Sequence, residues 1–298
     1  MPGQHFTFTI ILASGGFCNR SMHLSGNVLR KKYMLFHIQR DCAGLRGVVK
    51  WSKQPYEVNR MYPELQRIID ESPRIVFFGG AGVSTESGIP DFRSVDGLYN
   101  QRYAYPPETI LSATFFRQHT EEFYRFYRDK MLPLEAKPNP AHFFLAELEQ
   151  TGKLTAVITQ NIDGLHQAAG SKTVLELHGS IHRNRCLKCA QFFPPEYIRD
   201  SAGIPRCECK GIIKPEVVLY EEGLDDDVLS AAVHHIRQAD TLIIAGTSLT
   251  VYPAAGLVHY FRGQHLVLIN RDVTPMDDQA DLVIHDSVGK VFASLHCS

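Results

Sequence analysis

Short apolar runs recur along the chain from residue 75 onward, and none shows the polar alternation of a strand with one solvated face. A continuous apolar run bounded by turn residues is typical of a strand covered on both faces. Helical patterns lie between several runs, at residues 141–149, 228–237 and 253–260. This alternation predicts an α/β fold with a parallel sheet and helices on both faces. The predicted strands are residues 75–78, 154–158, 174–177, 241–245, 265–269 and 282–284.

Small and polar residues follow each of these runs. Ligands of open parallel sheets bind just outside the carboxyl ends of the strands, so a row of such residues predicts one long ligand crevice. The row consists of Gly79-Gly80, Thr159-Gln160-Asn161, His178-Gly179-Ser180, Gly246-Thr247-Ser248, Asn270-Arg271-Asp272 and Asp286-Ser287.

Glycines stand where the first strand should end. Gly79, Gly80 and Gly82 permit a tight turn and a close approach of the backbone to a ligand. The amides of a helix that follows would then face an anion such as pyrophosphate. Thr85 occupies the third glycine position of a dinucleotide fingerprint. The glycines alone therefore fit a nucleotide site or an ordinary strand-to-helix turn.

Two segments interrupt the alternation. The first, residues 95–134, is irregular and rich in aromatic residues, and it ends in a helical pattern. We interpret it as an insertion that covers the crevice. Aromatic stripes are more often packing than ligand platforms, so we expect most of its rings to lie in a core.

The second interruption is a cluster of cysteines. Cys186 and Cys189 are separated by two residues and Cys207 and Cys209 by one, with a gap of 17 residues between the pairs. This spacing predicts a zinc ribbon with one structural Zn²⁺, because four thiolates leave no open coordination position. Free or redox cysteines and a nucleic-acid zinc ribbon are the alternatives. Three further cysteines, Cys18, Cys42 and Cys297, belong to no motif.

Composition limits the possible partners. The 298 residues are 44% apolar and 21% charged, as in ordinary globular proteins, with 31 basic against 32 acidic side chains. Residues 1–60 hold nine Lys or Arg but only two acids, so the remainder is mildly acidic. We therefore expect no nucleic-acid binding. The clustered cysteines suit a metal in a reducing compartment, which favours the cytoplasm.

The first sixty residues show no sustained helical or strand period. Their apolar run at residues 6–13 is too short to cross a bilayer and has no basic residue before it, so we expect neither a membrane anchor nor a secretory signal. We interpret residues 1–60 as a weakly packed extension, or as sequence upstream of a native start at Met61. An organelle transit peptide is the alternative.

Four stretches together resemble the signatures of the sirtuins, the NAD-dependent protein lysine deacylases, and above all the bacterial NAD-dependent protein deacetylases. With the cysteine cluster and Gly246-Thr247-Ser248, the resemblance extends from Met61 almost to the end. The stretches are Gly80-Ala-Gly-Val-Ser continuing to Pro90-Asp-Phe-Arg93, Thr159-Gln-Asn-Ile-Asp-Gly-Leu-His166, Leu177-His-Gly-Ser180 and Lys214-Pro-Glu-Val-Val-Leu-Tyr220.

The resemblance implies one catalytic domain, residues 61–298. A Rossmann-like core would comprise residues 61–94, 135–180 and 214–298. A helical lid would occupy residues 95–134, and a small zinc module residues 181–213. It also implies that the protein binds NAD and acetylated proteins or peptides, and we expect a monomer.

The resemblance further implies a reaction and its residues. The acyl oxygen of a modified lysine attacks the nicotinamide ribose, releasing nicotinamide and forming an alkylimidate. His178 then takes a proton from a ribose hydroxyl, and hydrolysis leaves free lysine and O-acyl-ADP-ribose. Phe92, Ile162 and Asp163 would surround the nicotinamide. The full NAD site would be Ala81, Thr85, Phe92, Arg93, Gln160, Ile162, Asp163, His178, Thr247, Ser248, Asn270 and Asp286.

Substrate recognition is also carried over from the resemblance. Val218, Leu219 and Tyr220 should extend as a strand whose backbone pairs with the substrate peptide. Family members that remove succinyl or malonyl groups carry a Tyr and an Arg three residues apart in the lid helix. Here the pair is Tyr124 and Tyr127, so we expect an acetyl or other neutral acyl group, unless Arg125 or Arg128 supplies the missing charge.

Several other functions stay open on the sequence. A mono-ADP-ribosyltransferase or a desuccinylase would use the same scaffold. A nicotinamide oxidoreductase would need a hydride-transfer site, and the sequence offers none that is recognisable. A protein that only senses NAD, or a zinc-ribbon binding module, would turn over nothing and would be unaffected by His178→Ala.

Overall fold

The computed structural model describes residues 61–91 and 104–297. The predictions made for residues 1–60, for Phe92 and Arg93, and for residues 95–103 lie outside the described residues. The first described helix, α1 (Pro63–Glu71), begins with proline, whose fixed φ suits the first helical position. Leu65, Ile68 and Ile69 form its buried side.

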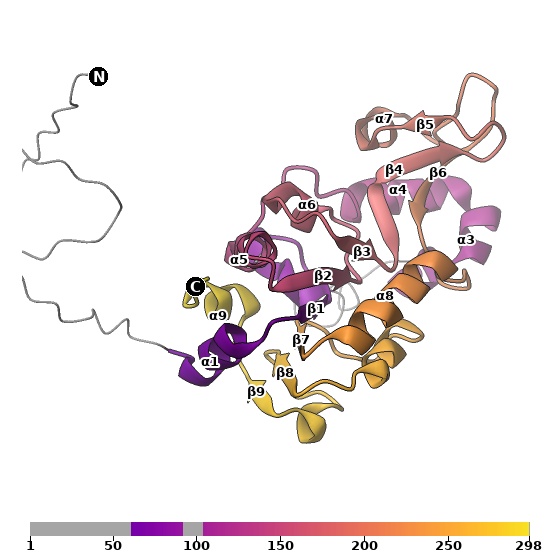
Figure 1. Ribbon diagram of the computed structural model, residues 1–298. Helices are drawn as coiled ribbons and strands as arrows, with labels where there is room; N and C mark the ends of the chain where they lie inside the picture. The colour runs from indigo at the N-terminus through magenta and orange to yellow at the C-terminus, as the bar shows by residue number, and fades with distance from the viewer. Residues whose placement is uncertain (1–60, 92–103, 298) are drawn as a thin grey trace, which may run out of the picture. The chain divides into compact units, whose positions relative to one another are not determined.

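All six predicted strands form one parallel sheet, which confirms the predicted fold class (Figure 1). The order across the sheet is β3-β2-β1-β7-β8-β9. The strands are β1 (Ile75–Gly79), β2 (Leu154–Thr159), β3 (Val174–Glu176), β7 (Thr241–Ala245), β8 (His265–Ile269) and β9 (Leu282–Ile284).

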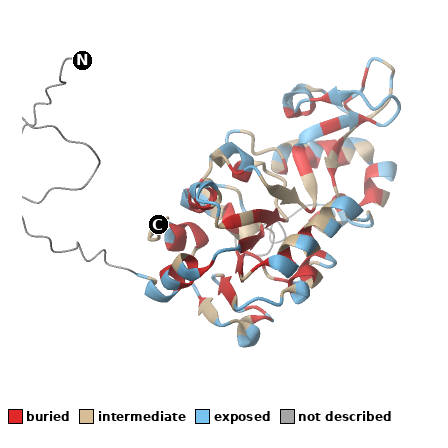
Figure 2. Ribbon diagram, viewed as in Figure 1, coloured by how far each residue is buried: buried red, intermediate tan, exposed pale blue. Residues whose placement is uncertain are grey.

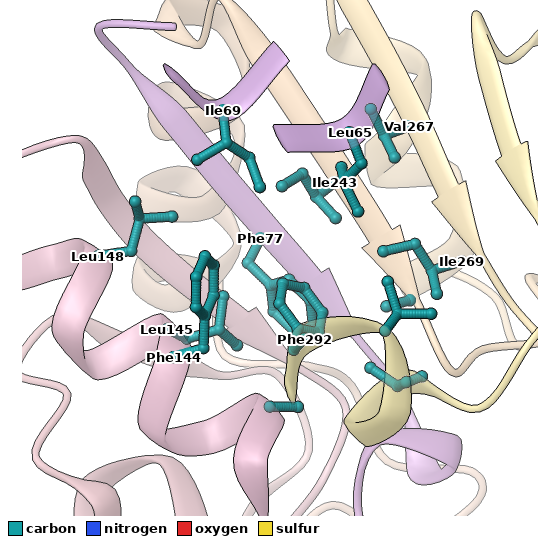
Figure 3. Close-up of a cluster of buried hydrophobic side chains, with 14 of the residues drawn as sticks. Leu65, Ile69, Phe77, Phe144, Leu145, Leu148, Ile243, Val267, Ile269 and Phe292 are labelled. Atoms are coloured by element: carbon teal, nitrogen blue, oxygen red, sulfur yellow. The ribbon is translucent and has the colours of Figure 1, made fainter. Parts of the chain in front are cut away.

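Alternate residues of each central strand enter two different cores, which explains the unbroken apolar runs. In β1, Phe77 packs into one core and Phe78 into the other. The first core is covered by α1, α5 (Pro140–Gln150) and α9 (Val288–Ala293), and Figure 3 shows Phe77 between side chains of these helices. The second is covered by α8 (Asp226–Gln238) and η4 (Ala254–Tyr260), the latter a 3₁₀ helix.

The order of the strands reverses once. From β1 the chain builds outward through β2 to β3, and it then returns to the other side of β1 and builds outward through β7, β8 and β9. The reversal therefore lies between β1 and β7. Ligands of open α/β sheets bind at such a point, outside the carboxyl ends of the strands. We call the loops that follow β1, β2, β3 and β7 the carboxyl edge.

A second, antiparallel sheet has the order β5-β4-β6. Its strands are β4 (Gly179–Cys186), β5 (Phe192–Phe193) and β6 (Ile213–Val217), with α7 (Pro195–Asp200) beside them. This sheet shares a third core with α2 (Pro107–Ile110), α3 (Ala113–Gln118) and α4 (Thr120–Lys130). Figure 2 shows buried segments, in red, along the helices of this region. The aromatic residues of α3 and α4 are buried in this core, as expected for packing residues: Phe115, Phe116, Phe123, Tyr124, Phe126 and Tyr127.

Three short 3₁₀ helices and one α-helix complete the described elements: η1 (Ala81–Val83), η2 (Thr85–Ser87), η5 (Asp277–Gln279) and α6 (Leu165–Ala169). Among the described residues, no helix is both long enough and apolar enough to cross a bilayer.

Candidate active site

The glycine turn after β1 sits at the reversal of the sheet. It forms two short 3₁₀ helices, η1 and η2. The Gly82 N–H donates to the Gly246 carbonyl at 2.8 Å, and a Cβ on Gly82 would lie 2.7 Å from the Gly246 Cα. On the sequence alone, Gly82 permits a tight turn and a close approach of the backbone to a ligand. In the structure, its lack of a side chain lets the loops after β1 and β7 pack backbone to backbone.

His178 follows β3 and is half-buried. Its Nδ1 lies 3.0 Å from the Gln160 carbonyl oxygen. Because a carbonyl only accepts, Nδ1 carries the ring proton, and the Nε2 lone pair is left to take a proton. Burial lowers the pKa of His178, and the hydrogen bond to Gln160 opposes this in part. The imidazole is therefore neutral near pH 7, the state that a general base requires.

Gln160 connects His178 to the rest of the carboxyl edge. Its N–H donates to the Gly79 carbonyl at 2.9 Å, and its side-chain amide donates to the Thr247 hydroxyl at 3.0 Å. His178 is thus two hydrogen bonds from the residue that begins the glycine turn. Three of the predicted NAD residues, His178, Gln160 and Thr247, are brought together from three different loops.

Asp163 is held by Ser84, a residue that the sequence analysis did not select. The buried Ser84 hydroxyl donates to Asp163 at 2.7 Å and accepts from the Asn161 side chain at 3.0 Å. The second carboxylate oxygen of Asp163 accepts from the Leu165 N–H at 2.9 Å, at the start of α6. The only sequence signal was a small hydroxyl inside the glycine turn, because the contact joins residues 79 positions apart.

The other predicted NAD residues lie in loops of the carboxyl edge or, for Asn270, in the loop that follows the neighbouring strand β8. Ala81 and Thr85 belong to η1 and η2. The Ser248 and Thr250 hydroxyls share a hydrogen bond of 2.8 Å, and the Asn270 side chain donates to the Asp272 carbonyl at 2.8 Å.

Asp286 follows β9, and its carboxylate is engaged within the protein. It accepts from the Tyr62 hydroxyl at 2.7 Å and from Lys290 Nζ at 2.5 Å. These bonds, the Lys290 one foremost, lower the pKa of Asp286 to about 2. A ligand at this position would meet a carboxylate whose oxygens already have partners.

The predicted substrate strand is shorter than expected. β6 ends at Val217, and beyond it only an isolated bridge joins Tyr220 to Ser112. The Val218 N–H donates to the His178 carbonyl at 2.9 Å, and the Tyr220 N–H donates to the Leu111 carbonyl at 3.0 Å. The chain itself therefore occupies these two donors, and the pairing of residues 218–220 with a substrate peptide stays a prediction.

The four cysteine sulfurs converge on one point. All lie within 4.8 Å of one another, and three of the pairs are 3.4, 3.5 and 3.6 Å apart. A tetrahedral Zn²⁺ with bonds of about 2.3 Å places its sulfurs roughly 3.8 Å apart, so the set fits this ion. Two tight turns present the pairs, with the Ala190 N–H bonded to the Cys186 carbonyl and the Lys210 N–H to the Cys207 carbonyl.

The lid helix α4 is fastened to the cysteine module. Arg128 donates to the Ile198 carbonyl at 2.9 Å and to the Ser201 hydroxyl at 2.9 Å, so its guanidinium binds the C-terminal end of α7.

Two tyrosines of α4 are buried. Tyr124 is fully buried and donates to the Ile213 carbonyl. The Tyr127 hydroxyl is buried with no hydrogen-bond partner among the described residues. The Arg128 guanidinium is thus bound at α7, and the Arg125 side chain lies on the exposed side of α4.

One further hollow lies at the opposite edge of the parallel sheet. It is lined by residues that precede β1, β7 and β8, among them Glu71, Asp240 and Gln264. Since parallel sheets bind ligands at the carboxyl ends of their strands, we assign the site to the carboxyl edge and not to this hollow.

Comparison with known proteins places the chain in a family. Residues 80–253 match the model of the Sir2 family. An NAD-dependent protein deacetylase of Clostridium acetobutylicum is 60% identical over 236 residues, which cover 78% of this chain and 96% of the relative. One from Cutibacterium acnes is 53% identical, covering 78% and 96%.

Solved Sir2 structures also match this chain. A Sir2 structure with deacetylated peptide and 3′-O-acetyl ADP-ribose matches with a TM-score of 0.73 at 40% identity, covering 78% of this chain and 96% of that one. A Sir2 structure with peptide and NAD⁺ matches with a TM-score of 0.69 at 42% identity, covering 77% and 95%. With the matched family model and these identities, the chain belongs to the Sir2 family.

Proposed function

We propose that the protein is an NAD-dependent protein deacetylase, which moves the acetyl group of a protein lysine onto ADP-ribose and releases nicotinamide. The observation that carries this is the setting of His178. A neutral imidazole, whose Nε2 carries the lone pair that can take a proton, lies two hydrogen bonds from the glycine turn, at the reversal of a parallel sheet. Relatives at up to 60% identity bear the same activity in their names.

Asp163, His178 and Gln160 have different roles in this reaction. NAD supplies a ribose carbon whose bond to nicotinamide breaks when the acetyl oxygen attacks. The Asp163 carboxylate, fixed by Ser84 and by the start of α6, orients the nicotinamide end. His178 Nε2 accepts the proton of a ribose hydroxyl, and the hydroxyl oxygen then attacks the carbon that bears the acetyl oxygen. Water adds to this carbon and the lysine amine leaves with a proton, so that free lysine and acetyl-ADP-ribose remain. Gln160 keeps the imidazole in the tautomer that allows this step.

The remaining predicted contacts belong to the same proposal. Ala81, Thr85, Thr247, Ser248 and Asn270 would line the dinucleotide, with Phe92 and Arg93 from the segment that follows the turn. Because its carboxylate is engaged, Asp286 would contribute through its backbone.

The substrate peptide would bind beside residues 218–220. The donors of Val218 and Tyr220 are occupied, whereas the Val218 carbonyl has no partner among the described residues. We infer that the peptide backbone donates to this carbonyl, and that the rest of its pairing comes from another loop of the carboxyl edge.

The four cysteines would hold one Zn²⁺ that maintains the module and takes no part in the chemistry. Four thiolates fill a tetrahedral site and leave no position for substrate. We further propose the domain limits that the sequence predicts: an extension at residues 1–60, and a catalytic domain 61–298 that contains a lid at 95–134 and a zinc module at 181–213.

For the acyl group we propose acetyl or another neutral chain. A succinyl carboxylate would need a cationic fork, and Arg128 is bound to α7. We also propose that the protein acts as a monomer in the cytoplasm, on acetylated proteins.

Mass spectrometry of an acetyl-lysine peptide, incubated with and without NAD, tests the proposal. The wild type should remove the acetyl mass only when NAD is present, and a succinyl-lysine peptide should react far more slowly. His178→Ala should lower the rate by about 10²- to 10⁴-fold, as expected for loss of a general base. Transfer of ADP-ribose to protein without loss of acetyl would instead indicate a mono-ADP-ribosyltransferase.

A further inference from the structure

Asn139, the residue before α5, makes more hydrogen bonds than a helix cap requires. Its Oδ1 accepts from the Ala141 N–H at 2.9 Å, which is the capping bond. Its Nδ2 donates to the Val83 carbonyl at 2.7 Å and to the Ser87 hydroxyl at 3.0 Å. A serine or aspartate would cap the helix equally well, because capping needs only an acceptor. The two hydrogen bonds that Nδ2 donates are therefore not explained by capping of α5.

The orientation of this amide is fixed by its neighbours. Oδ1 faces an N–H and Nδ2 faces a carbonyl, so only one assignment of the amide satisfies both. The Asn139 N–H donates in turn to His142 Nδ1 at 3.2 Å, which closes a capping box. Only 5% of Asn139 is exposed, so water cannot readily replace these partners.

The donated bonds end on the glycine turn itself. Val83 closes η1 and Ser87 closes η2, so the amide of Asn139 spans the two 3₁₀ turns from behind. Ser84 lies between them, and its hydroxyl holds both Asp163 and Asn161. A shift of the turn would therefore move the NAD-facing backbone and the Asp163 carboxylate together.

We propose that Asn139 is a positioning residue, which ties the glycine turn to α5 and so sets the nicotinamide end of the site. The proposal rests on the deacetylation proposed above. It assigns to Asn139 no contact with substrate, because its side chain acts through Val83, Ser87 and Ser84.

Asn139→Asp separates positioning from capping. The new carboxylate keeps the acceptor for the Ala141 N–H, but it puts an oxygen where Nδ2 faced the Val83 carbonyl. The carboxylate oxygen would repel the Val83 carbonyl oxygen, to which the amide donated a hydrogen bond. The glycine turn must therefore shift. We expect kcat/KM for NAD to fall by about 10- to 100-fold, as for displacements of about 1 Å in a site, with KM for the peptide within about twofold of wild type.

Two companion variants calibrate this result. Asp225→Ala removes the cap of α8, where Asp225 accepts from the N–H groups of Asp227 and Val228, and it leaves the glycine turn untouched. It should keep both KM values within about twofold. Ser87→Ala removes one of the two acceptors of Asn139 and should raise KM for NAD less than Asn139→Asp does.

Steady-state kinetics with NAD and peptide varied in turn give the decisive readout. A rise in KM for NAD in Asn139→Asp and Ser87→Ala, but not in Asp225→Ala, supports positioning. A kcat/KM for NAD within about twofold of wild type in Asn139→Asp, once corrected for the folded fraction measured by circular dichroism, overturns the proposal. Wild-type protein that removes no acetyl group would overturn the proposed function itself, whatever the variants do.

Discussion

The two sheets of this protein are held together by different means. In the parallel sheet, β1 is fully buried and contributes to an apolar core on each face. The antiparallel sheet has strands of eight, two and five residues, two pairs of cysteines at one end, and a core completed by α3 and α4. The first is stabilised by burial of its own side chains. The second has a cysteine cluster that fits a structural Zn²⁺ and a core shared with α3 and α4, so the two sheets should respond differently to the same perturbation.

Removing the metal should produce the largest difference between them. Structural Zn²⁺ in small modules contributes about 10–16 kcal/mol of binding free energy, far more than any single contact. Cys186→Ser should abolish zinc binding and remove the hydrogen-exchange protection of residues 181–213, with β1 and β7 still protected. Deacetylation should be lost, because β6 leads directly to Val218.

Cys297→Ser serves as the control for this prediction. Its thiol is half-buried and lies outside the cluster. Zinc content and activity should match the wild type. Loss of protection across the parallel sheet in Cys186→Ser would show that the two regions do not fold independently.

Gly82→Ala should damage the parallel region at the point where its two halves meet. The added Cβ would lie 2.7 Å from the Gly246 Cα and 2.9 Å from its carbonyl oxygen, both backbone atoms that cannot rotate away. We expect a loss of about 1–3 kcal/mol in the free energy of unfolding and weaker binding of NAD. Gly223→Ala, with no heavy atom within 4 Å of its Cβ, is the matched control and should leave both unchanged in denaturant titration and calorimetry.

Acid should weaken the parallel region through two buried histidines. His142 and His166 lie with ring centroids 4.7 Å apart, and burial lowers the pKa of both. The unfolded chain takes up these protons near pH 6.5, whereas the folded one does not. Stability is therefore full above that pH and falls as the pH drops below it, by up to about 1.4 kcal/mol per pH unit for each histidine.

His166→Leu tests this sign. Neither ring nitrogen of His166 has a hydrogen-bond partner among the described residues, so the replacement loses no such bond. Urea titrations between pH 7 and pH 5 should show a shallower decline than in the wild type. A steeper decline, or stability that rises on acidification, would contradict the assignment.

The smallest expected effect compares two tyrosines of the lid helix. Tyr124→Phe removes a hydroxyl that donates to the Ile213 carbonyl and should cost about 1–3 kcal/mol, because that carbonyl is left unpaired. Tyr127→Phe removes a buried hydroxyl without a partner among the described residues, so it should be neutral or stabilising. Equal losses in thermal unfolding would mean that Tyr127 has a partner elsewhere.

The parallel sheet was predictable because its signal is local. Each strand is a run of apolar residues buried on both faces, and the pattern located all six. The same local pattern did not show that the chain after β1 forms two 3₁₀ turns, or that residues 218–220 pair with the segment around Ser112. Those outcomes depend on partners distant in the sequence.

The site residues also fall into those with a local sequence signal and those that depend on distant partners. His178 and the cysteines stand in recognisable stretches, and the structure brings the cysteines together and sets His178 beside Gln160. Ser84 and Asn139 went unnoticed, because their partners lie 79 and 56 residues away. A serine in a glycine turn and an asparagine before a helix are common, so the local sequence does not reveal the long-range contacts that Ser84 and Asn139 make.

The stoichiometry of a single reaction mixture tests the account most directly. Nicotinamide, acetyl-ADP-ribose and deacetylated peptide should form in equal amounts from NAD and an acetyl-lysine peptide, and all three should fall together in His178→Ala. Nicotinamide released without loss of acetyl, or acetyl lost without consumption of NAD, would contradict the central claim that one site joins the two substrates.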